Sequence, residues 1–65
     1  MKNIQQQMIQ EMKKQGADRS VINWATGWLK TPEKAQQMMD YLISIREKHI
    51  PQGKVIDMID KIAEN

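Results

Sequence analysis

Apolar residues recur at the spacing of an α-helix in four separate segments, and this periodicity constrains the fold more than any other feature. In the first segment Ile4, Met8 and Met12 follow one another at intervals of four, so they fall on one helix face. Three more segments repeat the pattern, around residues 19–30, 32–49 and 54–64. None alternates apolar and polar residues as a half-buried strand does. The pattern predicts an all-α protein.

The clearest helix boundary lies at Thr31, Pro32 and Glu33. Threonine is a capping residue, proline suits the first helical position, and an acid complements the positive end of the helix dipole. The other predicted boundaries are a glycine after the first helix, a capping side chain before the second, and two breakers after the third: Gly16, Asp18 or Ser20, and Pro51 with Gly53. We therefore expect the third helix to run to about His49.

The two halves of the chain share one apolar pattern when they are aligned at an offset of 34 residues. The aligned pairs are Met8 with Leu42, Ile9 with Ile43, Val21 with Val55, Ile22 with Ile56, Trp24 with Met58, Ala25 with Ile59, Trp28 with Ile62, and Leu29 with Ala63. Either an internal duplication or two unrelated amphipathic hairpins would produce this match. With short connections favouring antiparallel neighbours, we expect a small four-helix domain, residues 1–65, built from two similar antiparallel hairpins at about 1–30 and 31–65.

A chain of 65 residues without cysteine must be stabilised by helix packing or by a second chain. Domains of this size bury only about 60% of the surface that the unfolded chain exposes. The residues nearest the centres of the apolar stripes are the expected core: Val21, Ala25, Trp28, Met38, Leu42, Ile45, Ile59 and Ile62. Trp28 lies near the centre of the second stripe, so we predict that it is buried.

The apolar runs are too short for a membrane protein. The longest is three residues, far below the ~20 that span a bilayer, and no charged-then-apolar leader opens the sequence. The first helix has a polar face made mainly of glutamine, which is poor for binding anionic lipid. We expect a cytoplasmic protein with no membrane partner.

The sequence offers little for catalysis or metal binding. His49 is the single histidine, and near the end of the third helix its ring suits the negative helix terminus. Ser20 and Ser44 have no base close in sequence, and Asp57 and Asp60 share an exposed helix face. There is no phosphate-binding glycine loop and no His/Cys cluster. We expect neither an enzyme, a cofactor, a metal site nor a small-molecule substrate.

Surplus apolar side chains favour a protein-binding role. The third helix is apolar over about 200°, which exceeds the ~100° stripe of an ordinary surface helix. Methionine adapts to irregular partners, and tryptophan is enriched at binding hot spots. The best candidates flank the stripes: Trp24, Met39, Tyr41 and Met58. We expect a non-catalytic protein-interaction module, a small regulatory or adaptor protein whose partner is another protein or a second copy of itself.

Nucleic-acid binding is the alternative. The segment Gln15-Gly16-Ala17-Asp18-Arg19-Ser20-Val21-Ile22 resembles the turn and second helix of repressor-type helix-turn-helix domains, with glycine in the turn and an aliphatic residue six positions later. The resemblance covers about a quarter of the chain, and Met12 stands where those domains usually have alanine. It implies that the helix after Gly16 reads DNA. The residues facing DNA would be Lys13, Lys14, Arg19, Asn23, Thr26 and Lys30.

Charge divides the two halves. Residues 1–32 carry five basic and two acidic residues, a net charge of +3, whereas residues 33–65 carry five basic and six acidic residues, a net charge of −1. At ~100° per residue, one face of the second helix gathers Arg19, Asn23, Thr26 and Lys30. The equivalent face of the fourth gathers Asp57, Asp60 and Glu64. These opposite charges predict weak, salt-sensitive self-association.

Overall fold

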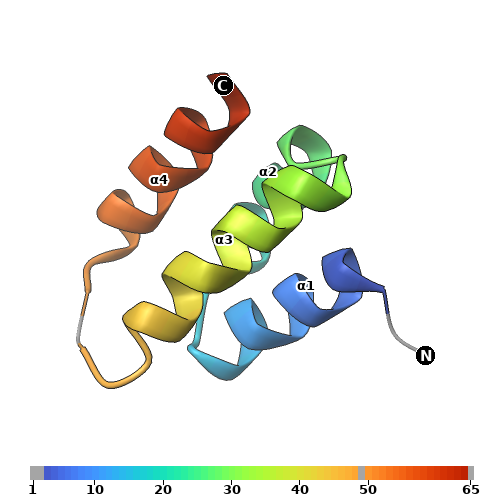
Figure 1. Ribbon diagram of the computed structural model, residues 1–65. Helices are drawn as coiled ribbons and strands as arrows, with labels where there is room; N and C mark the ends of the chain where they lie inside the picture. Colours follow the sequence, from blue (N-terminus) through green and yellow to red (C-terminus); the bar gives the residue numbers. More distant parts are fainter. Residues whose placement is uncertain (1–2, 49, 65) are drawn as a thin grey trace.

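The computed structural model describes residues 3–48 and 50–64. They form four α-helices: α1 (Ile4–Lys14), α2 (Arg19–Trp28), α3 (Pro32–Ser44) and α4 (Gln52–Glu64) (Figure 1). No strand occurs in these two ranges. The all-α class predicted from the periodicity is confirmed.

Local signals place most of the helix ends. Gly16 has a φ of 82°, the left-handed conformation expected of a glycine just after a helix. The Thr31 hydroxyl accepts a hydrogen bond from the backbone N–H of Lys34 at 3.2 Å, and Pro32 is the first residue of α3. Asp18 is the N-cap residue of α2, but its side chain makes no capping hydrogen bond.

The prediction that the third helix reaches about His49 is wrong, because α3 ends at Ser44. The Gln15 amide donates to the carbonyl of Leu42 at 2.8 Å, in addition to the longer bond of 3.3 Å that this carbonyl accepts from the backbone N–H of Ile45. The backbone N–H of Lys48 then bonds the carbonyl of Ile45 at 2.9 Å, closing a turn beyond the helix. His49 itself lies outside the described residues.

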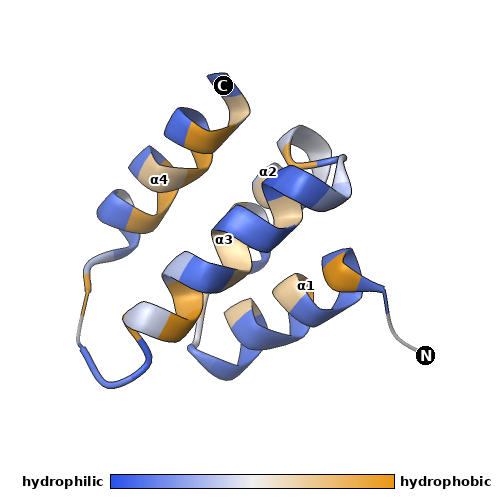
Figure 2. Cartoon of the chain, viewed as in Figure 1, coloured by the Kyte–Doolittle hydropathy of each residue, from blue (hydrophilic) through white to orange (hydrophobic). Residues whose placement is uncertain are grey.

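The four helices contact one another in a ring. The closest packing joins α1 to α3, and α2 packs on both α1 and α4, while α3 also packs on α4. In Figure 1, α1 and α3 both run from right to left, and α4 runs back towards the upper right. The main interface therefore joins an element of each half, and the apolar sides of the helices converge on one core (Figure 2).

The core matches most of the sequence expectation. Of the expected residues, seven are buried: Val21, Ala25, Met38, Leu42, Ile45, Ile59 and Ile62. Three methionines are fully buried and contribute much of the volume between α1 and α3: Met8, Met12 and Met38. Methionine is unbranched and flexible, so it fills the irregular space where two helices cross.

The prediction that Trp28 is buried is wrong, because its side chain is 61% exposed. Trp28 is the last residue of α2, and the chain leaves the helix at Leu29. Leu29 is fully buried, and its carbonyl accepts a hydrogen bond from the Gln5 amide of α1 at 2.8 Å. Leu29 thus fills the core position that the periodicity assigns to Trp28.

Candidate interaction surface on helix α2

Two exposed tryptophans dominate the outer surface of α2. Trp24 is 45% exposed and Trp28 is 61% exposed. Residues four apart lie on the same side of a helix, so the two indoles are neighbours. α2 buries its other side, formed by Val21, Ile22 and Ala25. The tryptophans therefore lie beside the buried side of α2, one helical turn apart, and both side chains are exposed.

The equivalent positions in the second half of the chain are covered. Trp28 aligns with Ile62, which is 4% exposed, and Trp24 aligns with Met58, which is half-buried and packs against the core. Some aligned positions match: Val21 and Val55 are both buried, as are Met8 and Leu42. Trp28 and Ile62 form the aligned pair in which one side chain is buried and the other is exposed.

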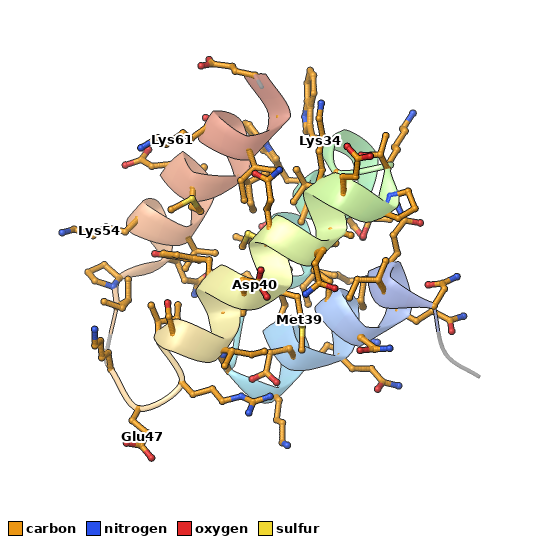
Figure 3. The ribbon with its side chains drawn as sticks, viewed as in Figure 1. Lys34, Met39, Asp40, Glu47, Lys54 and Lys61 are labelled. Atoms are coloured by element: carbon orange, nitrogen blue, oxygen red, sulfur yellow. The ribbon has the colours of Figure 1, made fainter. Side chains whose placement is uncertain are left out.

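The ends of α2 and α4 are contacted in the same way. The first turn of α3 lies beside the end of α4, where Lys34 (Figure 3) donates from Nζ to the carbonyl of Ala63 at 3.0 Å. The first turn of α1 likewise lies beside the end of α2, where the Gln5 amide donates to the carbonyl of Leu29 at 2.8 Å. Leu29 and Ala63 are aligned at the offset of 34 residues, so Trp28 stays exposed although the helix end beside it is contacted.

The other predicted partner residues are less accessible. Met39, Tyr41 and Met58 are all half-buried, and the last two pack against the core. Met39 projects from α3 towards α1 in Figure 3. An exposed apolar residue absent from the prediction is Ile43, which is 46% exposed and lies one turn after Met39. Of the four predicted residues, Trp24 has the most accessible side chain.

The residues assigned to nucleic-acid binding all reach solvent. They are Lys13 and Lys14 in the last turn of α1, Arg19, Asn23 and Thr26 on α2, and Lys30 just beyond it. The Thr26 hydroxyl donates to the carbonyl of Ile22 at 2.8 Å, so its proton is used within the helix. Arg19 and Lys30 lie at opposite ends of α2, about 15 Å apart at 1.5 Å per residue.

An ion pair between the buried Glu11 and the half-exposed Arg46, which the sequence analysis does not identify, connects α1 to the end of α3. Glu11 is 5% exposed and accepts hydrogen bonds from Arg46 Nη2 at 2.8 Å and Nε at 3.3 Å, and from the Gln15 amide at 2.9 Å. Glu11 follows Ile4 by seven residues and Met8 by three, so its place on the apolar stripe was the signal that it is buried.

Hydrogen bonds set the charge state of this pair. The Arg46 guanidinium first, and then the Gln15 amide, lower the pKa of Glu11 below its ordinary value, although burial opposes them. The carboxylate in turn raises the pKa of Arg46. A general acid or base needs a pKa near the working pH, so this ionised, fully bonded carboxylate is suited to joining helices.

An open groove borders the ion pair. Its lining comes from the ends of α1 and α3, the following turns and the start of α4, with apolar side chains such as Met12, Ile45 and Val55 beside Arg46. Within residues 3–48 and 50–64, no three side chains of the metal-binding types come together. The described helices are all too short and too polar to cross a membrane.

Comparisons of this chain with protein-family models, with curated proteins and with solved structures gave no match. The features that bear on function are therefore the two exposed tryptophans of α2, the polar side chains beside them, and the opposite charges of α2 and α4.

Proposed function

We propose that the protein is a non-catalytic interaction module that binds another protein chain through α2, with Trp24 and Trp28 as its anchors. The observation that carries this proposal is that the Trp28 side chain is 61% exposed, whereas the aligned Ile62 of the second half is buried. A tryptophan buries roughly 150–250 Å² when it is covered. Removing that area from water favours association at about 25 cal/mol per Å².

The packing of the second half suggests the form of the partner. The first turn of α3 donates a hydrogen bond through Lys34 to the carbonyl of Ala63, near the end of α4. A helical segment of the partner, packed on the exposed side of α2, would cover the Trp28 indole. Such a role fits a small regulatory or adaptor protein. The lack of cysteine is compatible with a cytoplasmic location, which forms part of the proposal.

The experiment uses three immobilised proteins: the wild type, Trp24→Ala/Trp28→Ala, and the control Ile43→Ala, which removes an exposed apolar side chain from α3. A protein retained by the wild type is purified, and its affinity for all three is measured by calorimetry. We expect the double variant to bind at least about tenfold more weakly, as for hot-spot tryptophans, and the control to bind within about twofold of wild type. Equal affinity for all three would refute the proposal.

Duplex DNA is the second candidate ligand, because Arg19, Asn23 and Lys30 are exposed along one side of α2. Binding to phosphates releases counterions, so the affinity must fall steeply as salt is raised. Fluorescence anisotropy of a labelled duplex, measured in low and moderate salt, tests this. Salt-dependent binding that Arg19→Glu/Lys30→Glu abolishes would establish DNA as the ligand. No binding in low salt would eliminate it.

A further inference from the structure

We infer that the partner of α2 is α4 of a second copy of this chain. The inference rests on the proposed function and names its partner. It is carried by two groups of exposed side chains with opposite charge. The basic stripe consists of Arg19, Asn23, Thr26 and Lys30, and the acidic stripe consists of Asp57, Asp60 and Glu64.

The two stripes align in sequence, although Lys30 lies two residues beyond the end of α2 and Glu64 is the last residue of α4. At the offset of 34 residues, Asn23 aligns with Asp57, Thr26 with Asp60, and Lys30 with Glu64. All seven side chains are exposed. Within the part of the chain that the structure describes, the ion pair is that of Glu11 with Arg46, so the stripe charges are not neutralised by partners there. Each stripe is free to meet its opposite on another molecule.

The shapes of the two helices also complement each other. Between the basic stripe and the tryptophans, the outermost positions of α2 are Ser20 and Gly27, and a Cβ atom added at Gly27 would meet no atom within 4 Å. The aligned positions of α4 are Lys54 and Lys61, which project outwards in Figure 3. Long side chains from α4 therefore face a shallow surface on α2.

This placement also deals with the like charges. Lys54 and Lys61 would meet the small side chains and the flanking indoles of α2 rather than Arg19 or Lys30. An ammonium group over an indole face is attracted to it. Asp18, beside Arg19, is the acidic residue nearest to the basic stripe, and it reduces the local charge.

Charge alone would not hold the two copies together. Exposed ion pairs each contribute little and are screened by salt. The stripes set the partner and the orientation, while the indoles of Trp24 and Trp28 supply the apolar contact. A stable interface buries about 800 Å² on each partner, roughly a sixth of the 4667 Å² surface of this molecule. A contact confined to one helix of each copy is smaller, so we expect a dissociation constant on the order of 0.1–1 mM.

The first experiment uses the unaltered protein. Sedimentation equilibrium, from micromolar to millimolar concentration, measures its mass in low salt and in about 0.5 M salt, where the Debye length is below 8 Å. We expect association in low salt that weakens at least about fivefold in high salt. Masses that stop at the dimer indicate a closed pair, and masses that continue to rise indicate a head-to-tail chain. Both contain the α2–α4 contact.

The second experiment reverses each stripe. Arg19→Glu/Lys30→Glu makes both stripes acidic, and Asp57→Lys/Asp60→Lys makes both basic, so each variant alone should associate at least about tenfold more weakly. An equimolar mixture should associate again, because every junction can then join opposite charges. The matched control is Lys13→Glu/Lys48→Glu, which makes the same change in net charge away from α2 and α4. It should associate like the wild type, because both of its stripes are unchanged.

Three outcomes would overturn the inference. The first is a wild type that is monomeric at millimolar concentration in low salt. The second is association that neither charge reversal weakens. The third is a mixture of the two variants that stays monomeric although circular dichroism shows both variants folded. Trp24→Ala/Trp28→Ala separates this test from that of the proposed function. Charge-dependent association that survives the loss of both indoles would refute the tryptophan anchor alone. A monomeric wild type would refute the second copy as partner, while tryptophan-dependent binding of a different protein would still uphold the proposed function.

Discussion

Glu11 is the residue whose environment departs most from what its chemistry favours. A buried carboxylate is costly unless hydrogen bonds and an opposite charge compensate it. Arg46 and Gln15 supply both, and the Gln15 amide also binds the carbonyl of Leu42. One small cluster thus joins α1 to the end of α3.

Replacing Arg46 by methionine tests this cluster. The change leaves Glu11 buried with the Gln15 amide as its remaining donor, so we expect a loss of about 1–3 kcal/mol in the free energy of unfolding. Urea unfolding followed by circular dichroism at neutral pH measures it. Glu11→Gln/Arg46→Met, which removes both charges, is the control and should lose less than Arg46→Met. If Arg46→Met is as stable as the wild type, the ion pair contributes nothing to the free energy of unfolding.

The same pair predicts how stability depends on pH. Because Arg46 and Gln15 lower the pKa of Glu11 in the folded state, the unfolded chain binds its proton first as the pH falls. The stabilisation by Glu11 is complete above its unfolded pKa and is lost as the pH falls through the folded pKa. Urea unfolding between about pH 2 and 6 should show this decline. In Arg46→Met the decline should be smaller, and an unchanged profile would contradict the assignment.

Trp28 and Leu29 give a third residue-scale prediction, because these neighbours have opposite exposure. Trp28→Ala removes a surface side chain and should change the free energy of unfolding by less than about 1 kcal/mol. Leu29→Ala leaves a cavity in the core and should cost about 2–5 kcal/mol. Thermal unfolding of the two variants compares them directly. Equal destabilisation would mean that Trp28 is a core residue after all.

These residues show what periodicity can and cannot predict. It places the interior of each stripe correctly, as at Ala25, Met38 and Ile59. It fails at Trp28 because the helix ends there, and beyond a helix end the 100° spacing no longer describes which side chain turns inward. For Glu11 the two sequence signals disagreed, because its position on the apolar stripe predicted burial whereas its charge predicted exposure.

At the scale of the helices, two glycines test whether backbone conformation or available space determines the effect of a glycine-to-alanine substitution on stability. Gly16 follows α1 with a φ of 82°, whereas Gly27 lies inside α2, and neither has an atom within 4 Å of an added Cβ. Gly16→Ala should destabilise by about 1 kcal/mol because alanine resists that φ. Gly27→Ala should stabilise by up to about 1 kcal/mol because alanine favours helix. Chemical unfolding measures the free energy of unfolding of both variants. Changes of the same sign in the two variants would contradict this account.

The start of α3 was easier to predict than its end, whereas the start of α4 was missed, because Gly53, expected to be a helix breaker, lies inside α4 (Gln52–Glu64). Thr31 and Pro32 are local signals, and they set the start of α3 as expected. Its end at Ser44 depends on contacts with α1, thirty or so residues away, through Gln15 and Glu11. No pattern within the third segment contains that information.

For the whole molecule, the packing of α1 on α3 makes each half depend on the other. The closest interface joins the halves rather than the helices within one half. A peptide of residues 1–30 would therefore lose most of the cover on Met8 and Met12, which are fully buried in the intact chain. Helices of this length are marginal alone in water.

We therefore expect the 1–30 peptide to be largely unfolded and the intact chain to unfold in a single cooperative transition. Circular dichroism of the peptide, of the 31–65 peptide and of their equimolar mixture tests this. The mixture should regain helix that neither peptide has alone. A peptide 1–30 with a cooperative melt of its own would show that the halves are independent.

The candidate surface was predictable only in part. Charge is visible in sequence, so the basic and acidic stripes were found and the structure leaves both exposed. Trp24 was found because it flanks a stripe, but the exposure of Trp28 follows from α2 ending there, with Leu29 buried in its place. No local signal in the sequence marks that helix end.

The methionine-rich interior has a chemical consequence. An oxidant reaches a thioether through solvent, and the sulfoxide it forms is polar and disrupts a core. Among the methionines that the structure describes, the half-buried Met39 and Met58 would be oxidised first, whereas Met8, Met12 and Met38 become reachable only when the helices separate. Damage to the interior would then proceed no faster than the molecule opens. The oxidation rate of Met8, Met12 and Met38 would therefore report how often the helices separate. Binding of a second copy would lower that rate.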